Sequence, residues 1–386
     1  MSLNILSQRG IFEGSAFCFL YELENLLVST CSANLLIPRT NKITQWLNQK
    51  NLSRSLTKKI MENTIGLYNP IDINLPSDQE PNVLLVFCLN PAHLSMLTAI
   101  PEWRERFDVV AAYVIDAWDL QIYPKEISEI DHLFVPVQEC VRELSQEFNI
   151  GVSLLPFGAD VLRYSSTDAE RPIDVMSFGR NPVNFHLQLT ETLNDSVSHY
   201  LYYRHPGLCG NWLPDTSQYE GRGDHELRRL FHKMIQRSKI ILAFDPLYQT
   251  DQIYETRKVN SRKWKFRHSI LSLRWFEGCA AGCVILGKRP QTPLFDDIMG
   301  WKDSAIELPD DESQWIPFTL DLLADDVRLA TIRQRNYEQT LAHHDWRYRI
   351  HDIFNTLNLK VPQGLNKELA QLSVNLSCSK DMNCQT

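Results

Sequence analysis

The chain has 386 residues, of which 44% are apolar, 22% charged and 10% aromatic, values typical of globular proteins made of two or three domains. Its formal net charge of −8 argues against nucleic-acid binding, which normally uses a basic face. No apolar run approaches the ~18 residues that a membrane span needs, and the amino terminus does not have the pattern of a signal peptide. The nine cysteines show no zinc spacing. We therefore expect a cytoplasmic protein with reduced thiols and no metal site.

The first part of the chain alternates apolar strands with helices, which predicts a doubly wound α/β domain with a parallel sheet. Ligands of such sheets gather beyond the carboxyl ends of the strands. Gly14 and Ser15 follow the first strand, and Asp116 and Trp118 follow a later one, so these four are candidate binding residues. Strands are expected at 3–6, 35–38, 82–89, 109–115, 132–137 and 152–156, with helices to about 27, around 53–65, and at 91–105 and 138–147.

A polar connection over 161–172 separates this domain from a second alternation of strands and helices. Its strands are expected at 173–178, 200–203, 239–244, 283–286 and 305–308, with helices ending near 194 and at 224–237, 312–324, 326–343 and 344–357. The polar residues from about 364 onward predict a loose tail. We thus predict an N-terminal domain at 1–165, a C-terminal domain at 166–343, a closing helix at 344–363 that packs back across both domains, and a flexible tail at 364–386.

The segment 269–287 carries the most specific pattern in the chain. Leu273, Phe276 and Ala280 lie at helical spacing, and Gly282 stands where the helix should end before an apolar strand. Ser269 or Ser272 can cap the helix start, which with Arg274 nearby predicts an anion site. The alternative is a surface helix held by an Arg274–Glu277 pair, worth roughly 0.2–0.5 kcal/mol.

Several motifs together resemble the GT-B glycosyltransferases. They are Gly179-Arg180 after the first strand of the second half and the Phe-Glu-x-x-Ala-x-Gly pattern that begins at Phe276. More narrowly, Ser272-Leu-Arg274-Trp-Phe-Glu277-Gly-Cys-Ala-Ala-Gly282 resembles the Ser-x-Arg-x-Phe-Glu-Ala-x-Ala-x-Gly motif of the CgeB-like branch of glycosyltransferase group 1. Two further segments are similar to landmarks of that branch: Pro156-Phe-Gly158-Ala-Asp160 and His343-His344-Asp345-Trp346-Arg347-Tyr-Arg349.

The resemblance implies a GT-B fold, in which two Rossmann-like doubly wound domains face each other across a cleft. It implies transfer of a sugar, of the hexosyltransferase type, from a UDP- or GDP-sugar to a hydroxyl of a glycan, a lipid-linked acceptor or a small molecule. Retention of configuration and independence from metals and cofactors are expected from the same relatives.

The resemblance also assigns roles to residues of the second domain. It places Glu277 on the donor ribose, since a carboxylate can accept from both hydroxyls of a cis-diol, and Arg180 on the diphosphate. The family has a pair of glutamates, Glu-x7-Glu, and Glu277 matches the second. This chain has Ser269 at the position of the first, so the carboxylate that usually contacts the donor sugar is missing. The lysine that usually follows Gly-Arg is missing too, and its charge would come from Arg274 or from the basic insertion 257–267. The alternative for Arg180 is an ordinary surface arginine.

Three further features remain open between a functional and a structural interpretation. Asp116 is either a general base for the acceptor or a hydrogen-bonded turn residue. His205 either lies near the nucleobase or is a buried structural histidine. The basic segment 257–267 either captures diphosphate or an anionic acceptor, docks peripherally on a membrane, or is a solvated loop.

The missing carboxylate at Ser269, the missing lysine after Arg180 and the aspartate at Asp116, where many relatives carry a histidine, leave room for an alternative from another class. The chain could be a catalytically degenerate GT-B protein that binds or scaffolds without turnover. A hydrolase or epimerase of nucleotide sugars would need a carboxylate facing C2 of the donor sugar, and no residue points to one.

Overall fold

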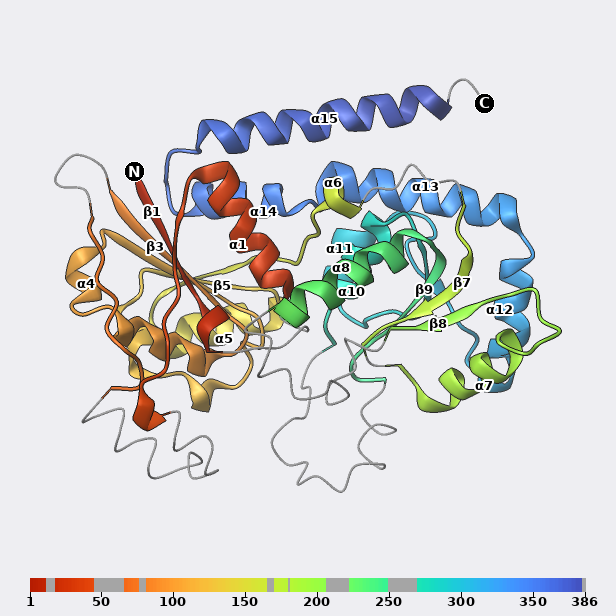
Figure 1. The fold of residues 1–386 in the computed structure, drawn as a ribbon, viewed down its shortest axis with the longest axis horizontal. Helices are drawn as coiled ribbons and strands as arrows, with labels where there is room; N and C mark the ends of the chain where they lie inside the picture. Colours follow the sequence, from red (N-terminus) through yellow and green to blue (C-terminus); the bar gives the residue numbers. More distant parts are fainter. Residues whose placement is uncertain are drawn as a thin grey trace. The chain divides into compact units, whose positions relative to one another are not determined.

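The computed structural model describes residues 1–11, 18–44, 66–75, 81–164, 170–179, 181–205, 222–248 and 269–383. The chain forms two compact units, shown in Figure 1. The first unit comprises Met1–Pro156 and Ile350–Lys367, and the second comprises Phe157–Arg349 and Glu368–Thr386. The predicted helix around 53–65 lies outside the described residues, as do Gly14, Ser15, Arg180 and the basic segment 257–267.

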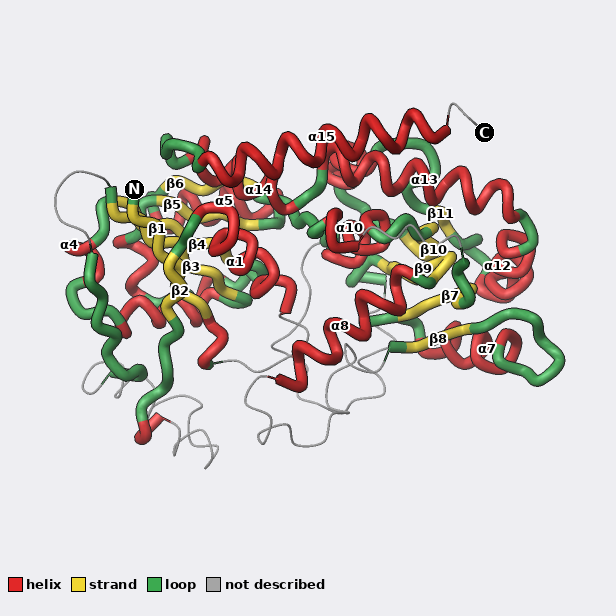
Figure 2. Tube along the Cα trace, turned by 45° about the horizontal axis from the view of Figure 1, so that its top comes forward, coloured by secondary structure: helices red, strands yellow, loops and turns green. Residues whose placement is uncertain are grey.

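The first unit is built on a parallel sheet of six strands in the order β2-β1-β3-β4-β5-β6. Its centre is fully apolar: Val83 to Cys88 in β3 are all buried, as expected for a strand covered on both faces. The tube drawing in Figure 2 shows these strands side by side. The strands are β1 (Ser2–Ser7), β2 (Asn34–Leu36), β3 (Asn82–Cys88), β4 (Val109–Val114), β5 (His132–Val135) and β6 (Gly151–Leu154).

One predicted helix of this unit is wrong. Residues 91–105 form a 3-10 helix, η3, that ends at Ala99, and then the short helix α4. Ile100 is extended, with φ −106° and ψ 106°, because the residue before a proline, here Pro101, is pushed out of the helical region. The helices of the unit are η1 (Gln8–Gly10), α1 (Cys18–Cys31), η3 (Pro91–Ala99), α4 (Trp103–Arg106), η4 (Leu120–Ile122), η5 (Lys125–Glu129) and α5 (Gln138–Phe148).

The second unit has a parallel sheet of five strands in the order β11-β10-β9-β7-β8. The chain runs from β7 out to β8 and returns to β9 on the other side of β7. The strand order therefore reverses between β7 and β9, and such a switch point is where open α/β sheets bind ligands. The strands are β7 (Ile173–Ser177), β8 (Tyr202–Arg204), β9 (Ser238–Phe244), β10 (Val284–Lys288) and β11 (Ile306–Glu307).

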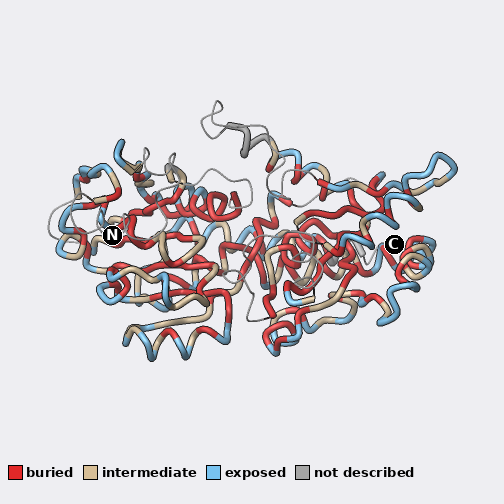
Figure 3. The backbone as a smooth tube through the Cα atoms, turned by 90° about the horizontal axis from the view of Figure 1, so that it is seen from below, coloured by how far each residue is buried: buried red, intermediate tan, exposed pale blue. Residues whose placement is uncertain are grey.

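Helices cover this sheet (Figure 1), and a cluster of buried apolar residues lies along its strands. Figure 3 colours the backbone by the burial of each residue. None of the helices in the described part of the chain is both long and apolar enough to cross a membrane. The helices that lie wholly within this unit are α6 (Val161–Tyr164), α7 (Val183–Leu193), α8 (Arg222–Gln236), α10 (Leu273–Ala280), α11 (Pro293–Met299), η9 (Glu312–Gln314), α12 (Trp315–Leu323) and α13 (Asp326–His343). Two further helices, α14 (Trp346–Thr356) and α15 (Gln363–Asn383), are each divided between the units, because Ile350–Lys367 belongs to the first.

The predicted loose tail is a helix instead, since α15 continues from Gln363 to Asn383. Its buried positions Leu365, Leu372 and Ser379 are spaced by seven residues, which places them along one side of a helix. Ser379 accepts a 2.7 Å hydrogen bond from Gln334 of α13. The polar composition of the segment concealed this sparse apolar spacing.

Candidate functional site

Gly179 and Arg274 meet at the switch point of the second sheet. Gly179 lies two residues after the end of β7 and has φ +70°, and a Cβ built on it would lie 3.6 Å from Cδ of Arg274. The guanidinium of Arg274 donates long hydrogen bonds to the carbonyl of Phe178, at 3.5 Å, and to that of Phe244, at 3.4 Å. Arg274 is only 8% exposed. A buried positive charge thus spans the carboxyl ends of β7 and β9.

Arg274 is held there by α10, whose predicted helix and following strand are confirmed. The helix starts after Ser272 and is followed by Gly282 at φ +64°. Ser272 occupies the N-cap position, yet its buried Oγ makes no capping bond and has no hydrogen-bond partner among the residues that the structure describes. Gly278 allows α10 to lie directly on the sheet, because a Cβ there would overlap Ile241 of β9 and Ile285 of β10.

The surface-helix interpretation assumed that Glu277 pairs with Arg274. The structure pairs Glu277 with a different arginine. Its side chain is 3% exposed and forms an ion pair with Arg228 of α8, which is 6% exposed. Glu277 Oε1 also accepts a 2.9 Å bond from the hydroxyl of Tyr164, and Arg228 donates to the same hydroxyl at 2.7 Å. Arg228 stands 49 positions away in sequence, so helical spacing gave no signal of this pair.

His205 belongs to the same neighbourhood. It follows β8, is fully buried and lies 5.6 Å from the ring of Phe231, over which the Arg228 guanidinium is placed at 4.7 Å. The Tyr203 hydroxyl is 3.2 Å from His205 Nδ1. Burial, reinforced by the charge of Arg228, lowers the pKa of His205 to about 4. The ring is therefore neutral at pH 7.

A carboxylate that the sequence analysis did not consider stands beside Ser269. Asp245, which directly follows β9 and is 5% exposed, accepts a hydrogen bond from Ser269 Oγ. The backbone N–H of Gln291 donates to Ser269 Oγ at 2.7 Å and to Asp245 at 3.3 Å. The only sequence signal was the position of Asp245 at a strand end. Ser269, where the resemblance predicts a carboxylate, is thus hydrogen-bonded to one.

The predicted acceptor-side residues belong to the first unit. Asp116 is half-buried after β4, and its backbone N–H donates to the carbonyl of Leu89 at 2.7 Å. Trp118 is also half-buried. The described residues contain no cluster of three histidine, cysteine or acidic side chains placed to hold a metal ion.

The first unit also contains a buried acid that the sequence analysis missed. Glu24 of α1 is fully buried and accepts hydrogen bonds from Ser7 Oγ at 2.8 Å and from Arg9 Nε at 2.7 Å. Burial raises the pKa of Glu24 to about 7, although Arg9 and Ser7 act in the opposite direction.

Comparison with known proteins agrees with the expected fold. Residues 209–355 match a protein family described as glycosyl transferase-like. Two crystal structures of HepE from Anabaena, one with UDP and glucose and one with UDP-glucose, align over 93% of this chain and 99% of theirs, at 11% identity and TM-scores of 0.50. A glycosyltransferase from Rickettsia africae aligns over 92% of this chain and 97% of its own at 8% identity, with a TM-score of 0.45. No curated protein sequence matches.

At such low identity the likeness to HepE shows the fold, which is mixed α/β with parallel sheets of the Rossmann-like type seen in GT-B glycosyltransferases. The glycosyl transferase-like match covers α10, β10 and the helices that follow. Together these findings support a GT-B glycosyltransferase. The CgeB-like branch stays a prediction.

Proposed function

We propose that the protein transfers a hexosyl group from a nucleotide-diphosphate sugar, UDP- or GDP-linked, to a hydroxyl acceptor. The observation that carries this proposal is the buried Arg274 guanidinium beside Gly179 at the switch point of the second sheet. A fixed cation next to the start of α10 suits a diphosphate, since helix N-termini and arginine both favour phosphate oxygens. The glycosyl transferase-like match of this region supports the same activity.

In the proposed reaction, the bond between the anomeric carbon and the diphosphate oxygen breaks, and negative charge develops on the departing phosphate. Arg274, together with Arg180, would neutralise that charge from fixed positions, which is how preorganised groups lower such barriers. The reaction would need neither a metal nor a cofactor and would retain the anomeric configuration.

The remaining residues of the second unit would hold the nucleoside. Within the described part of the chain, the hydrogen bonds that the Glu277 carboxylate accepts both end on Oε1, so Oε2 would accept from ribose hydroxyls. The neutral ring of His205 would lie near the base. Ser272 would donate its hydroxyl to the diphosphate or to the sugar.

Residues of the first unit would serve the acceptor. Asp116 would accept the proton of the attacking hydroxyl, and Gly14, Ser15 and Trp118 would position a glycan, a lipid-linked acceptor or a small molecule. We further propose that the protein is cytoplasmic and binds no nucleic acid, and that the basic segment 257–267 provides peripheral membrane contact.

Thermal-shift measurements with UDP, GDP, ADP and their sugars test donor binding. One nucleotide should stabilise the protein, by about 2.7 kcal/mol at ~100 times its Kd. Arg274→Ala should remove this stabilisation and Arg274→Lys should weaken it. Arg335→Ala is the matched control, because Arg335 of α13 forms a partly exposed pair with Asp303. No response to any nucleotide would contradict the proposal.

A second assay separates transfer from binding. The assay measures release of the nucleoside diphosphate from whichever nucleotide sugar binds. It should be run with neutral, lipid-linked and small acceptors, with and without EDTA. Asp116→Asn should lower the transfer rate without changing nucleotide binding. Stabilisation by a nucleotide with no release under any of these conditions would favour the binding or scaffold alternative.

A further inference from the structure

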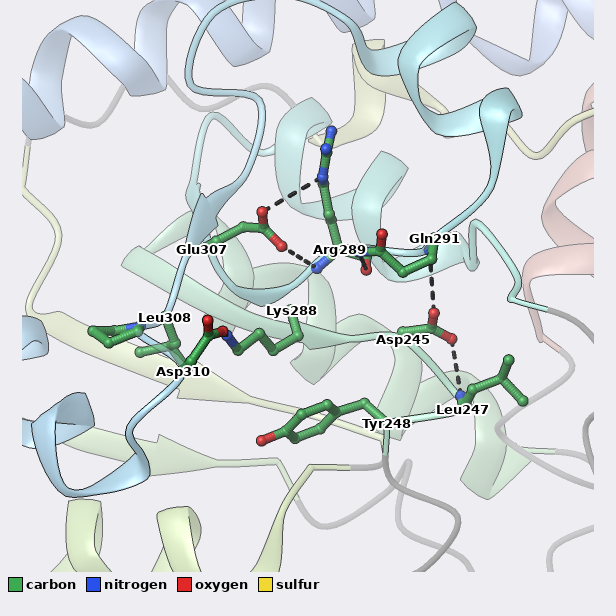
Figure 4. Close-up of a pocket in the computed structure, with 10 residues that line it drawn as sticks. Asp245, Leu247, Tyr248, Lys288, Arg289, Gln291, Glu307, Leu308 and Asp310 are labelled. Atoms are coloured by element: carbon green, nitrogen blue, oxygen red, sulfur yellow. Dashed lines mark hydrogen bonds and ion pairs between the residues drawn. The ribbon is translucent and has the colours of Figure 1, made fainter.

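A cavity of about 690 Å³ opens in the second unit at the carboxyl ends of β9, β10 and β11 (Figure 4). Its volume lies within the range of small-molecule sites. Gly179, Arg274 and Glu277 do not line it. Its lining therefore differs from the residues that are proposed to hold the donor. Its lining includes the charged and aromatic residues Asp245, Tyr248, Lys288, Arg289, Glu307 and Asp310.

The charges of the lining disfavour an anionic ligand. Lys288 pairs with Asp310 at 2.9 Å. Arg289 pairs with Glu307 at 3.5 Å, and also with Asp296 at 2.8 Å. Both cations of the lining therefore already face carboxylates, and its acidic side chains outnumber its basic ones. A phosphate or carboxylate group would have to displace these partners.

The same pairs suit hydroxyl groups. A hydroxyl both donates and accepts, so it can bridge an ammonium or guanidinium and the carboxylate beside it without disrupting either charge. Figure 4 shows Lys288 beside Asp310 and Arg289 beside Glu307, and all four residues line the cavity. A ligand with several neighbouring hydroxyls matches this arrangement of alternating donors and acceptors.

Tyr248 adds an aromatic wall that is held in place. Its ring stacks on Phe244 at 5.8 Å and 30°, lies 6.0 Å from Trp315, and its hydroxyl donates to Glu312 at 2.9 Å. A rigid aromatic ring supplies contact area at little entropic cost. It would pack against the C–H face of a pyranose ring.

Asp245 connects the cavity to the proposed donor residues. It lines the cavity and also binds Ser269, shortly before the start of α10. From this cavity we infer that the protein has a second carbohydrate site, which takes a neutral saccharide. Its ligand differs from the nucleotide of the proposed donor site.

Saturation-transfer-difference NMR on the full chain tests this inference. The probes are maltotetraose, cellotetraose and xylotetraose, each in the presence of saturating UDP, with an anionic heparin tetrasaccharide for comparison. At least one neutral probe should give ring-proton signals that UDP leaves unchanged. Tyr248→Ala should weaken its affinity about tenfold, or about 1.4 kcal/mol, whereas Tyr248→Phe, which keeps the ring, should retain binding.

Paired carboxylate variants supply the matched control. Asp310→Asn alters a lining residue that pairs with Lys288, and Asp296→Asn alters an equivalent exposed pair with Arg289 outside the lining. Only Asp310→Asn should weaken the saccharide. Because the Asp310 side chain is fully exposed, this variant keeps its fold even if Tyr248→Ala does not.

Any of the following results would overturn the inference: no signal from any neutral probe, displacement of the saccharide by UDP, or equal losses in Asp310→Asn and Asp296→Asn. Stronger binding of the heparin fragment than of every neutral probe would also overturn it. Failure of the donor proposal looks different, because the protein would then show no thermal shift with any nucleotide while the saccharide signals persisted.

Discussion

At the scale of single residues, Glu277 has two roles: its ion pair with Arg228 stabilises the fold, and its carboxylate is proposed to bind the donor. Both side chains are almost fully buried, and a buried charge that loses its partner is costly. The carboxylate that would bind the ribose therefore also holds α10 against α8. Substitutions at Glu277 affect folding and binding at once.

We expect Glu277→Ala to lower the free energy of unfolding by about 3–5 kcal/mol, because it leaves the Arg228 charge buried without its partner. Replacing both residues by methionine should recover most of this loss. Glu307→Ala, which removes an exposed carboxylate paired with Arg289, should cost no more than about 1 kcal/mol. Urea denaturation of the four proteins measures these differences, and a Glu277→Ala loss as small as that of Glu307→Ala would contradict the expectation.

At the scale of elements, glycines set how closely α10 and β10 approach β9. A Cβ on Gly278 would overlap the ends of two isoleucine side chains, whereas a Cβ on Gly287 would overlap the backbone carbonyl of Ala243. Side chains can change rotamer, but the backbone of a central strand cannot move without distorting its ladder. A methyl group at Gly278 would therefore require two isoleucine side chains to move, whereas one at Gly287 would require the backbone of β9 to move.

Gly278→Ala should therefore destabilise the protein by about 1–3 kcal/mol, the usual range for overpacking, and Gly287→Ala should destabilise it more. Gly287→Ala would also displace β9 next to Asp245, so saccharide binding in the cavity should be weaker than in Gly278→Ala. Thermal melts and the NMR assay give both readouts. Equal melting temperatures for the two variants would show that the backbone overlap is relieved more easily than expected.

The elements could be predicted from the sequence where the pattern is local. Helix 273–280, its terminal glycine and the following strand were readable because apolar spacing and Gly282 both report on neighbouring residues. The pairing of Glu277 with Arg228 and of Ser269 with Asp245 was not readable, since each joins residues from different elements. The helical tail was missed because the three buried positions within 363–379 are too few to stand out.

At the scale of the whole molecule, buried ionisable groups make stability depend on pH. Glu24 keeps its proton in the folded state up to about pH 7, whereas in the unfolded chain it loses the proton near 4.5. Between these pH values the folded state binds more protons, so stability falls as pH rises. The shift corresponds to on the order of 3 kcal/mol, at about 1.36 kcal/mol per pKa unit.

Glu24→Gln removes this titration and should flatten that part of the pH dependence. We expect the free energy of unfolding of the natural protein, minus that of Glu24→Gln, to be largest near pH 4.5 and to shrink as pH rises through 7. Buried histidines such as His205 contribute with the opposite sign, but equally in both proteins, so they cancel in the difference. Parallel pH profiles from chemical denaturation would contradict this assignment.

The way the chain is divided between the two units has a practical consequence for making fragments. The chain passes from one unit to the other at Pro156–Phe157, at Arg349–Ile350 and again at Lys367–Glu368. A fragment cut after residue 165 would therefore lack 350–367, where Gly364 packs closely against the backbone carbonyl of Thr30 in α1. Expressing the first unit alone would require splicing 350–367 onto its end, and no single cut would release both units whole.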